Sequence, residues 1–422
     1  MNRLAPPTPR APRQKGCGPF APVSVAADSL RLTVFERIRA EGSVARATIA
    51  KDLAISPATV TTQTSALIDM GFLIEAPIEQ DDSETSRGRP PIGLAVRPEA
   101  HLVIGLKLSD KVHTAALYDF AGRQMASATL PAGRDTSTAA ILAITDTLMR
   151  EVCHNGGVTA SDISAVGVGV PGFVHSARGS VHWSPLFDGP CLDFADRLAT
   201  ALGCPAIIEN DANLIALAEL WFGVGRQISD FAVVTIEHGV GMGLVIGHKL
   251  YAGARGMGME LGHTKVALDG ALCRCGQRGC LEAYVSDYAL AREADLASRS
   301  ARPNAPIHEV LEALYRDAKA GNATAKSVFD RAGKYLALGM GNVANLFDPE
   351  LIILSGDRMQ YDYLYSDEIL QEMKRFALNS GVPLPPVEVH AWGDLVWASG
   401  AAAMALSHLT VQALSPAGTS PR

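Results

Sequence analysis

The chain has 422 residues, more than one hydrophobic core usually holds, so its length predicts two or three domains. Its composition, 48% hydrophobic and 6% aromatic, is ordinary for an α/β protein, and no apolar run reaches the roughly 18 residues of a membrane span, which argues against membrane insertion. The net charge is −7, yet residues 1–97 hold 12 Lys+Arg against 10 Asp+Glu. This asymmetry fits a nucleic-acid module on an acidic body, but it is small enough to arise by chance.

The two ends of the chain have the composition of disordered segments. Residues 1–27 are rich in Pro and Arg and lack the apolar stretch of a signal peptide, so we expect a disordered arm on a cytoplasmic protein. Residues 412–422 are expected to form a disordered tail. Seven cysteines, an odd number without secretory signals, argue against a disulfide framework.

Residues 28–97 carry the pattern of a winged helix-turn-helix domain. Apolar residues recur at helical spacing in three short segments, and Gly42 is expected to end the first. Ser43 is predicted to cap the second helix, and Ser56, followed by Pro57 at the first helical position, the third. The tight turn before Ser56 gives the helix-turn-helix order, and residues 72–74 and 93–96 are expected to pair as a wing.

The third helix of this unit offers side chains suited to DNA. Short hydroxyls and amides reach base edges and phosphates, and the predicted contacts are Ser56, Thr59, Thr61, Thr62 and Gln63. In the loop before the second wing strand, Arg87 and Arg89 form an Arg-Gly-Arg-Pro hook that fits a narrow minor groove. The alternatives are a solvated helix face and a solvated loop with two unrelated arginines.

Residues 98–411 alternate strands and helices. The pattern predicts a strand hairpin over 101–119, a helix near 136–154, a strand ending at the turn of residues 170–172, and a short strand running into a helix near residue 209. Two strands joined by a Gly-rich turn follow at 231–253, and further on come a helix over 325–346, a strand over 351–356 and an Ala-rich helix. Two rounds of this pattern predict two α/β lobes with a ligand cleft between them.

A cluster of metal-ligating residue types lies in the second half of the body. His263, Cys273, Cys275 and Cys280 supply one imidazole and three thiolates, which suits one tetrahedral, structural Zn²⁺ per chain with no position open for water. Gly276 and Gly279 would let the loop double back. Reduced buried cysteines and a redox switch are the alternatives.

Several motifs of the body resemble those of the ROK family, which comprises sugar kinases and sugar-responsive repressors. The resemblance covers residues 30–411 and rests on VPG at 170–172, ENDAN at 209–213, ELGH at 260–263, CRCGQRGCLE at 273–282 and NLFDPELIILSG at 345–356. It implies a two-lobed, ribonuclease-H-like body of the actin-type ATPase fold. The N-terminal module places the chain with regulators of the N-acetylglucosamine or xylose repressor type, because the kinases lack it.

The resemblance also implies a sugar site and a zinc site. The matching sugar-binding positions are Gly172, Asn210, Asp211, Glu260, His263 and Glu282. In the family the His and Cys cluster binds zinc, and His263 would present its second ring nitrogen to the sugar. Asn210 and Asp211 could instead cap a helix, and Glu282 could be a solvated helix residue. Leu186 replaces the Asn that many relatives place against a sugar hydroxyl, which leaves the identity of the sugar open.

Both phosphate loops implied by the resemblance are altered. The family pattern G-x-D-x-G-G-T is matched by residues 105–111, in which Lys107 replaces the metal-associated Asp and Asp110 replaces a glycine. The pattern T-x-G-T-G-x-G-x-G is matched by residues 235–243, in which Glu237 and His238 replace glycine and a small hydroxyl. A base at Asp211 does not suffice for phosphoryl transfer. We therefore predict no kinase activity and interpret Asp211 as a relic base.

Together these patterns predict a sugar-responsive, DNA-binding repressor of carbohydrate uptake or catabolism genes. Its partners would be a double-stranded DNA operator and a sugar or sugar phosphate effector, and we expect a homodimer or a dimer of dimers, because helix-turn-helix proteins usually read palindromic half-sites. Two alternatives remain: an ATP-dependent sugar kinase with a fused DNA-binding domain, and a regulator controlled by a subunit of a sugar transporter.

Overall fold

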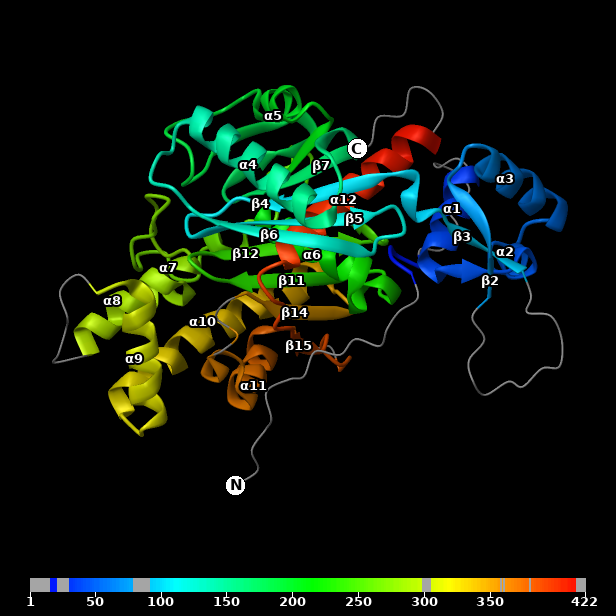
Figure 1. The fold of residues 1–422 in the computed structure, drawn as a ribbon. Helices are drawn as coiled ribbons and strands as arrows, with labels where there is room; N and C mark the ends of the chain where they lie inside the picture. The colour runs from blue at the N-terminus through cyan, green and yellow to red at the C-terminus, as the bar shows by residue number, and fades with distance from the viewer. Residues whose placement is uncertain are drawn as a thin grey trace.

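The computed structural model describes residues 16–20, 30–78, 92–297, 305–356, 359, 361–378 and 381–414 (Figure 1). Its core is a pair of five-stranded sheets with helices between and around them, and a smaller helical unit lies at one end. Within the described part of the chain, we find no helix that is both long and apolar enough to cross a membrane.

The N-terminal unit combines three helices with a three-stranded sheet. The helices are α1 (Leu30–Glu41), α2 (Arg46–Asp52) and α3 (Pro57–Asp69). The sheet has the order β1-β3-β2, with strands β1 (Ser43–Val44), β2 (Leu73–Pro77) and β3 (Ile92–Val96). Strands β2 and β3 pair antiparallel, which confirms the pairing expected of residues 72–74 and 93–96.

The helix ends in this unit agree with the sequence at two positions and differ at a third. Gly42 follows the last residue of α1 with φ of 81°, a conformation that glycine adopts without strain. The Thr59 amide donates to Ser56 Oγ at 3.1 Å, so Ser56 caps α3 as predicted. The predicted cap at Ser43 is wrong, because Ser43 lies in β1 and Ala45 precedes α2 without a side-chain cap.

The first sheet of the body has the order β10-β7-β4-β5-β6. Its strands are β4 (Leu102–Lys107), β5 (Val112–Asp119), β6 (Gln124–Pro131), β7 (Ile163–Val170) and β10 (Ala206–Asn210). Strands β4 and β5 form the predicted antiparallel hairpin, whereas β4, β7 and β10 run parallel. Two helices, α4 (Thr138–Gly156) and α5 (Phe194–Leu202), and a small hairpin of β8 (Phe173–His175) and β9 (Ser180–Trp183) complete this lobe.

The second sheet has the order β13-β12-β11-β14-β15. Its strands are β11 (Phe231–Ile236), β12 (Val240–Ile246), β13 (Lys249–Leu250), β14 (Leu351–Ser355) and β15 (Val387–Val389). The helices of this lobe are α7 (Glu282–Val285), α8 (Asp287–Ala297), α9 (Ile307–Lys319), α10 (Ala323–Phe347) and α11 (Asp367–Phe376). A core of its own lies between α10 and the sheet, with Phe329, Leu336 and Met340 fully buried.

Two helices occupy the layer between the sheets, α6 (Asp211–Phe222) and α12 (Val396–Leu414) (Figure 1). Helix α12 packs on β4, β7 and α6, and α6 packs on β12 of the second sheet. The approach is close because glycines line it: a Cβ on Gly105 would lie 1.8 Å from the Ala398 carbonyl oxygen, and one on Gly400 would lie 1.9 Å from that of Leu214. This arrangement is the two-lobed α/β body that the sequence predicts.

The N-terminal unit shares a continuous hydrophobic core with the body. Phe35 and Ile38 of α1 belong to the same buried cluster as Trp221 of α6 and Leu406 of α12. Residues 16–20 pack into this junction, where Cys17 is 2% exposed. The predicted disordered arm over 1–27 is therefore wrong for these five residues, which are ordered against the body.

Candidate metal and ligand site

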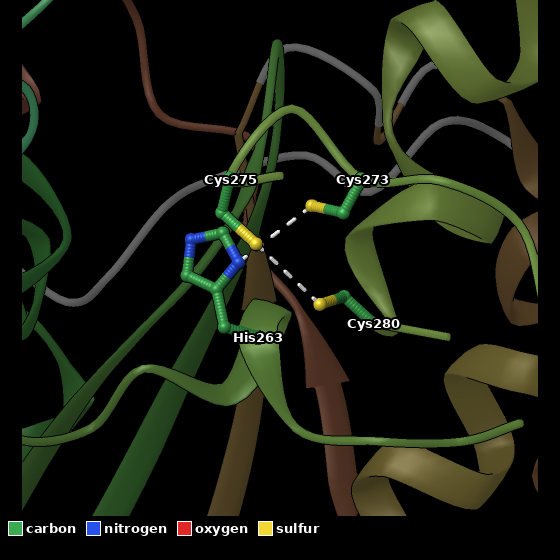
Figure 2. Close-up of side chains that lie close together, drawn as sticks. All are labelled: His263, Cys273, Cys275 and Cys280. Carbon is green, nitrogen blue, oxygen red and sulfur yellow. Dashed lines mark hydrogen bonds between the residues drawn. The ribbon is translucent and has the colours of Figure 1, made fainter. Parts of the chain in front are cut away.

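The four predicted metal ligands lie close together in the segment between β13 and α7 (Figure 2). One donor atom from each of His263, Cys273, Cys275 and Cys280 lies within 4.8 Å of the other three. The Cys275 and Cys280 sulfurs are 3.7 Å apart, and Cys273 Sγ is 3.7 Å from His263 Nδ1. A tetrahedral ion with bonds of about 2.3 Å to sulfur places its ligand atoms about 3.8 Å apart, so the cluster could hold a metal ion such as zinc.

A lysine side chain lies against the cluster: Lys265 Nζ is 2.9 Å from Cys280 Sγ. Burial raises the pKa of the Cys273 thiol to about 12, and a bound metal ion would favour its thiolate form. Cys273 and Cys280 are buried, whereas Cys275 is exposed. Gly279 has φ of 74°, and a Cβ there would lie 1.6 Å from the Ala267 carbonyl oxygen, so the loop doubles back only with glycine at this position.

The metal cluster and the predicted sugar residues meet at Glu282, the first residue of α7. Glu282 Oε1 lies 3.5 Å from Cys273 Sγ and accepts a hydrogen bond from the Tyr288 hydroxyl at 3.3 Å. Its other oxygen accepts from the Val240 amide at 3.4 Å. Glu282 is therefore held in place by two elements, and the alternative of a solvated helix residue does not describe it. Tyr288 lies outside the motifs, and sequence reasoning missed it.

Gly172 and Asn210 are joined by a hydrogen bond. The Asn210 side-chain amide donates to the Gly172 carbonyl at 2.8 Å, and its Oδ1 accepts from the Ala212 amide at 2.9 Å, so Asn210 caps α6. Gly172 has φ of 113°, and a Cβ there would lie 2.2 Å from the Trp183 carbonyl oxygen. Both residues thus have structural tasks that account for their identity, in addition to the ligand contacts predicted for them.

The remaining carboxylates influence one another electrostatically. Burial raises the pKa of Asp211, at the first position of α6, and the positive charge of Lys107 opposes this shift. Desolvation, with the charges of Asp211 and Glu282, raises the pKa of Glu260 to about 7. Glu260 directly precedes the short turn Leu261–His263, and a Cβ on Gly241 of the second loop would lie 2.8 Å from Ala212, the residue after Asp211. The fold therefore gathers the predicted sugar residues beside the metal cluster, and the Phe173 ring lies 6.2 Å from that of His263.

The two altered phosphate loops also face each other. His238 Nε2 lies 3.8 Å from Asp110 of the first loop, and His238 Nδ1 lies 3.9 Å from the buried Asp287 of α8. The second loop lies against the sugar residues, because a Cβ on Gly239 would be 2.7 Å from Glu282 Oε2. Lys107 Nζ lies 3.0 Å from the centre of the Trp397 ring. Protein side chains thus contact one another where the resemblance places phosphate-binding loops.

The predicted DNA-contacting residues form a separate set on α3. Ser56, Thr61 and Thr62 are exposed, and the two threonine hydroxyls donate to the backbone carbonyls four residues earlier. Thr59 is partly buried, and its hydroxyl lies 2.8 Å from Ser56 Oγ. Gln63 accepts from Arg31 of α1 at 3.2 Å, which adds a basic side chain that sequence reasoning missed. Arg87 and Arg89 lie outside the described residues.

The two sheets, the helices between them and the His and Cys cluster define a two-lobed α/β protein of the sugar-kinase-like class. The model of the ROK family matches residues 103–408, so the chain belongs to the ROK family.

Both regulators and kinases of this family are similar to the chain. The xylose repressor of Caldicellulosiruptor bescii is 25% identical over 388 residues, covering 90% of this chain and 96% of the repressor. The glucokinase of Streptomyces coelicolor is 30% identical over 274 residues, covering 62% of this chain and 86% of the kinase. A solved ROK family transcriptional regulator, a homologue of the E. coli MLC protein, has the same fold, with a TM-score of 0.73 at 23% identity over 89% of this chain and 95% of that one.

Proposed function

We propose that the chain is a sugar-responsive, DNA-binding transcriptional regulator that represses genes of carbohydrate uptake or catabolism. The observation that carries the proposal is the continuous core that joins a three-helix unit to a sugar-kinase-like body. The similarity to a xylose repressor over 96% of that protein's length supports the same function. In this proposal residues 28–97 bind a DNA operator, residues 98–411 bind the sugar, and the protein acts in the cytoplasm as a homodimer or a dimer of dimers.

The DNA-binding surface would be the exposed face of α3. Ser56, Thr59, Thr61, Thr62 and Gln63 would contact base edges and phosphates, with Arg87 and Arg89 in the minor groove. The order of three helices followed by a strand pair supports this, because winged helix-turn-helix proteins place the second helix of the motif in the major groove.

The effector would be a sugar or sugar phosphate held by the carboxylates beside the metal cluster. Asp211, Glu260 and Glu282 would accept hydrogen bonds from adjacent hydroxyls, and His263 would use Nδ1 for the metal and Nε2 for the sugar. A structural Zn²⁺ would fix the loop that carries His263. Binding would shift the equilibrium between two arrangements of the DNA-binding units, provided that the sugar prefers one of them.

The altered phosphate loops argue that this regulator has no kinase activity. Phosphoryl transfer needs Mg²⁺ and backbone groups that neutralise the phosphates. Lys107 takes the position of the metal-associated carboxylate, while Asp110 and Glu237 add negative charge where phosphates would bind. The intact Asp211 and the similarity to a glucokinase keep a sugar kinase with a fused DNA-binding domain as the second candidate. A coupled ADP-release assay with aldohexoses and aldopentoses separates the two, because sustained turnover would exclude the regulator-only function.

The central test measures DNA and sugar binding in one protein. Duplexes selected by the full chain from a random library should bind tightly, and the Thr61→Ala/Thr62→Ala variant should lose at least about tenfold affinity. Thr147→Ala, an exposed α4 threonine with the same hydroxyl-to-carbonyl bond, is the matched control and should bind normally. A panel of aldohexoses, aldopentoses and their phosphates should contain a sugar that weakens DNA binding, and Asp211→Ala should lose this response. Release only on addition of a sugar-transporter subunit would indicate control by that protein instead.

A further inference from the structure

Lys107 is a half-buried charged residue whose backbone is paired with a strand on each side. It is the last residue of β4 and pairs with Thr114 of β5 on one side and Gly169 of β7 on the other. Its ammonium lies 3.0 Å from the centre of the Trp397 ring, which is 4% exposed. A cation over the face of a buried aromatic ring is attracted by the ring quadrupole, so this contact holds Trp397 to the end of β4.

The same ammonium lies near the candidate sugar site. Gly169 of β7 pairs with Lys107 on one side and with Glu209 of β10 on the other, so Lys107 and Asp211, the residue after β10, lie at the same edge of the first sheet. The positive charge of Lys107 opposes the rise that burial causes in the pKa of Asp211. Asp211 starts α6, whereas Trp397 lies in the first turn of α12. One cation therefore links a sugar-site carboxylate to the beginning of the helix that crosses the body.

Helix α12 carries this link to the N-terminal unit. Its backbone contacts β4 and α6 directly at Ala398 and Gly400, so little side-chain packing is available to absorb a shift of the helix. Near its other end, the Arg39 guanidinium of α1 donates to Thr410 Oγ1. Arg39 is itself buried and lies over the Trp221 ring, with 5.1 Å to the ring centre. Figure 1 shows α12 running from the layer between the sheets to the side of α1.

We propose that Lys107 is the positioning residue that couples effector binding at Asp211 to α12, and through α12 to the DNA-binding helices. The inference rests on the function proposed above and names the regulatory step of that site. Sugar hydroxyls that donate hydrogen bonds to Asp211 would replace part of the electrostatic stabilisation that the Lys107 ammonium gives to this carboxylate. Lys107 then interacts more with Trp397 and less with Asp211, and this is the differential contact that coupling between two sites requires.

The alternative is that Lys107 only compensates a buried carboxylate. In that case its removal would weaken folding or sugar binding, but the sugar would still act on DNA binding by the same factor. The measured quantity is therefore the coupling ratio, the Kd for DNA with saturating sugar divided by the Kd without it. Couplings in allosteric proteins are commonly 5- to 150-fold.

The experiment compares the full-length protein with three variants, using the panel sugar that raises the melting temperature most. Lys107→Met, which keeps the length but removes the charge, should bind DNA as the wild type does, yet its coupling ratio should fall below about 3 from a wild-type value of 10 or more. Lys107→Arg should retain most of the coupling. Lys111→Met, an exposed lysine in the same loop, is the matched control and should match the wild type.

The outcomes separate the two proposals. A wild-type ratio in Lys107→Met, or an equal loss in Lys111→Met, would overturn the role of Lys107 while leaving the proposed function intact. A wild-type protein that binds DNA but shows no sugar effect would overturn the proposed function and this inference with it. If Lys107→Met does not fold, two variants of Trp397 make the same comparison, because Trp397→Phe keeps a ring beneath the cation and Trp397→Leu removes it. A coupling ratio that is lower in Trp397→Leu alone supports the role of Lys107. Equal coupling ratios in the two variants oppose it.

Discussion

The metal ligands and the predicted sugar residues differ sharply from the two altered loops that lie next to them. On one side, the His and Cys donor atoms stand at the spacing of a tetrahedral site, and Glu260 and Glu282 lie beside them. On the other side, Lys107 and His238 contact Trp397 and Asp110. In the proposed function the first side receives the ligand, whereas the second is occupied by contacts within the protein. If the proposal holds, this chain keeps the recognition half of a sugar-kinase site and uses the half that would bind phosphates for another task.

The largest expected effect concerns the metal cluster. Cys280→Ser removes one of four ligands from a buried position, so metal content should fall from about one per chain to near zero and the melting temperature should drop by at least about 5 °C. Elemental analysis of the purified protein and thermal unfolding measure the two quantities. Cys204→Ser, outside the cluster, is the control and should keep its metal. Normal metal content in Cys280→Ser would show that the four side chains do not form one site.

A second prediction concerns the glycine that opens the first loop. In Gly105→Ala the new Cβ would collide with the Ala398 carbonyl, a backbone atom that cannot move alone, and we expect a loss of about 3 kcal/mol or more in the free energy of unfolding. Urea denaturation measures it. Gly133→Ala, whose nearest neighbour would be 4.0 Å away, should change stability by less than about 0.5 kcal/mol. Equal stability of both variants would mean that Gly105 is not retained for the packing of α12.

The features that could be predicted from the sequence depend on residues that are close together along the chain. The Ser56 cap, the β4–β5 hairpin and the spacing of the four metal ligands each depend on a short stretch, and the structure has them as expected. The cap predicted at Ser43 failed because pairing with β3 draws this residue into a strand, and a long-range partner outweighs a local preference.

Contacts between segments that are distant in the chain could not be predicted from the sequence. Lys107 and Trp397 are 290 positions apart, and no local pattern marks either as the other's partner. Residues 16–20 read as part of a disordered arm by composition, yet buried Arg226 donates to the Gly18 carbonyl and Cys17 to that of Arg39. The composition of a segment indicates how much apolar surface it can bury by itself. It does not indicate which contacts the segment makes with the rest of the protein.

A third prediction uses the charge on Glu260. Desolvation and the neighbouring carboxylates raise the pKa of Glu260 to about 7, so the folded protein keeps this proton above the usual carboxyl range. If the sugar needs the ionised acceptor, its affinity should rise about tenfold from pH 6 to pH 8, as the ionised fraction does. Protein stability should change with pH in the opposite direction to sugar affinity. The free energy of unfolding should fall as pH rises from about 4.5 to about 7, because in this range Glu260 keeps its proton in the folded state and loses it in the unfolded state.

Calorimetric titrations with the panel sugar at three pH values measure this dependence. Glu260→Gln cannot ionise and should bind the sugar with an affinity that varies much less over the range. An equally steep pH profile in Glu260→Gln would assign the titration to another group and would weaken the contrast between the two sides of the site.

The smallest expected effect tests the loop side directly. His238 is 38% exposed and lies 3.8 Å and 3.9 Å from its two carboxylate neighbours, Asp110 and Asp287. Both contacts are long and His238 and Asp110 are exposed to solvent, so His238→Ala should lower the free energy of unfolding by no more than about 0.5 kcal/mol, with the difference shrinking in high salt. Urea denaturation at low and high ionic strength checks this, with Asp110→Ala as the partner variant. A loss above about 1.5 kcal/mol in both variants would mean that the pair holds the loops together, because a solvated contact cannot account for it.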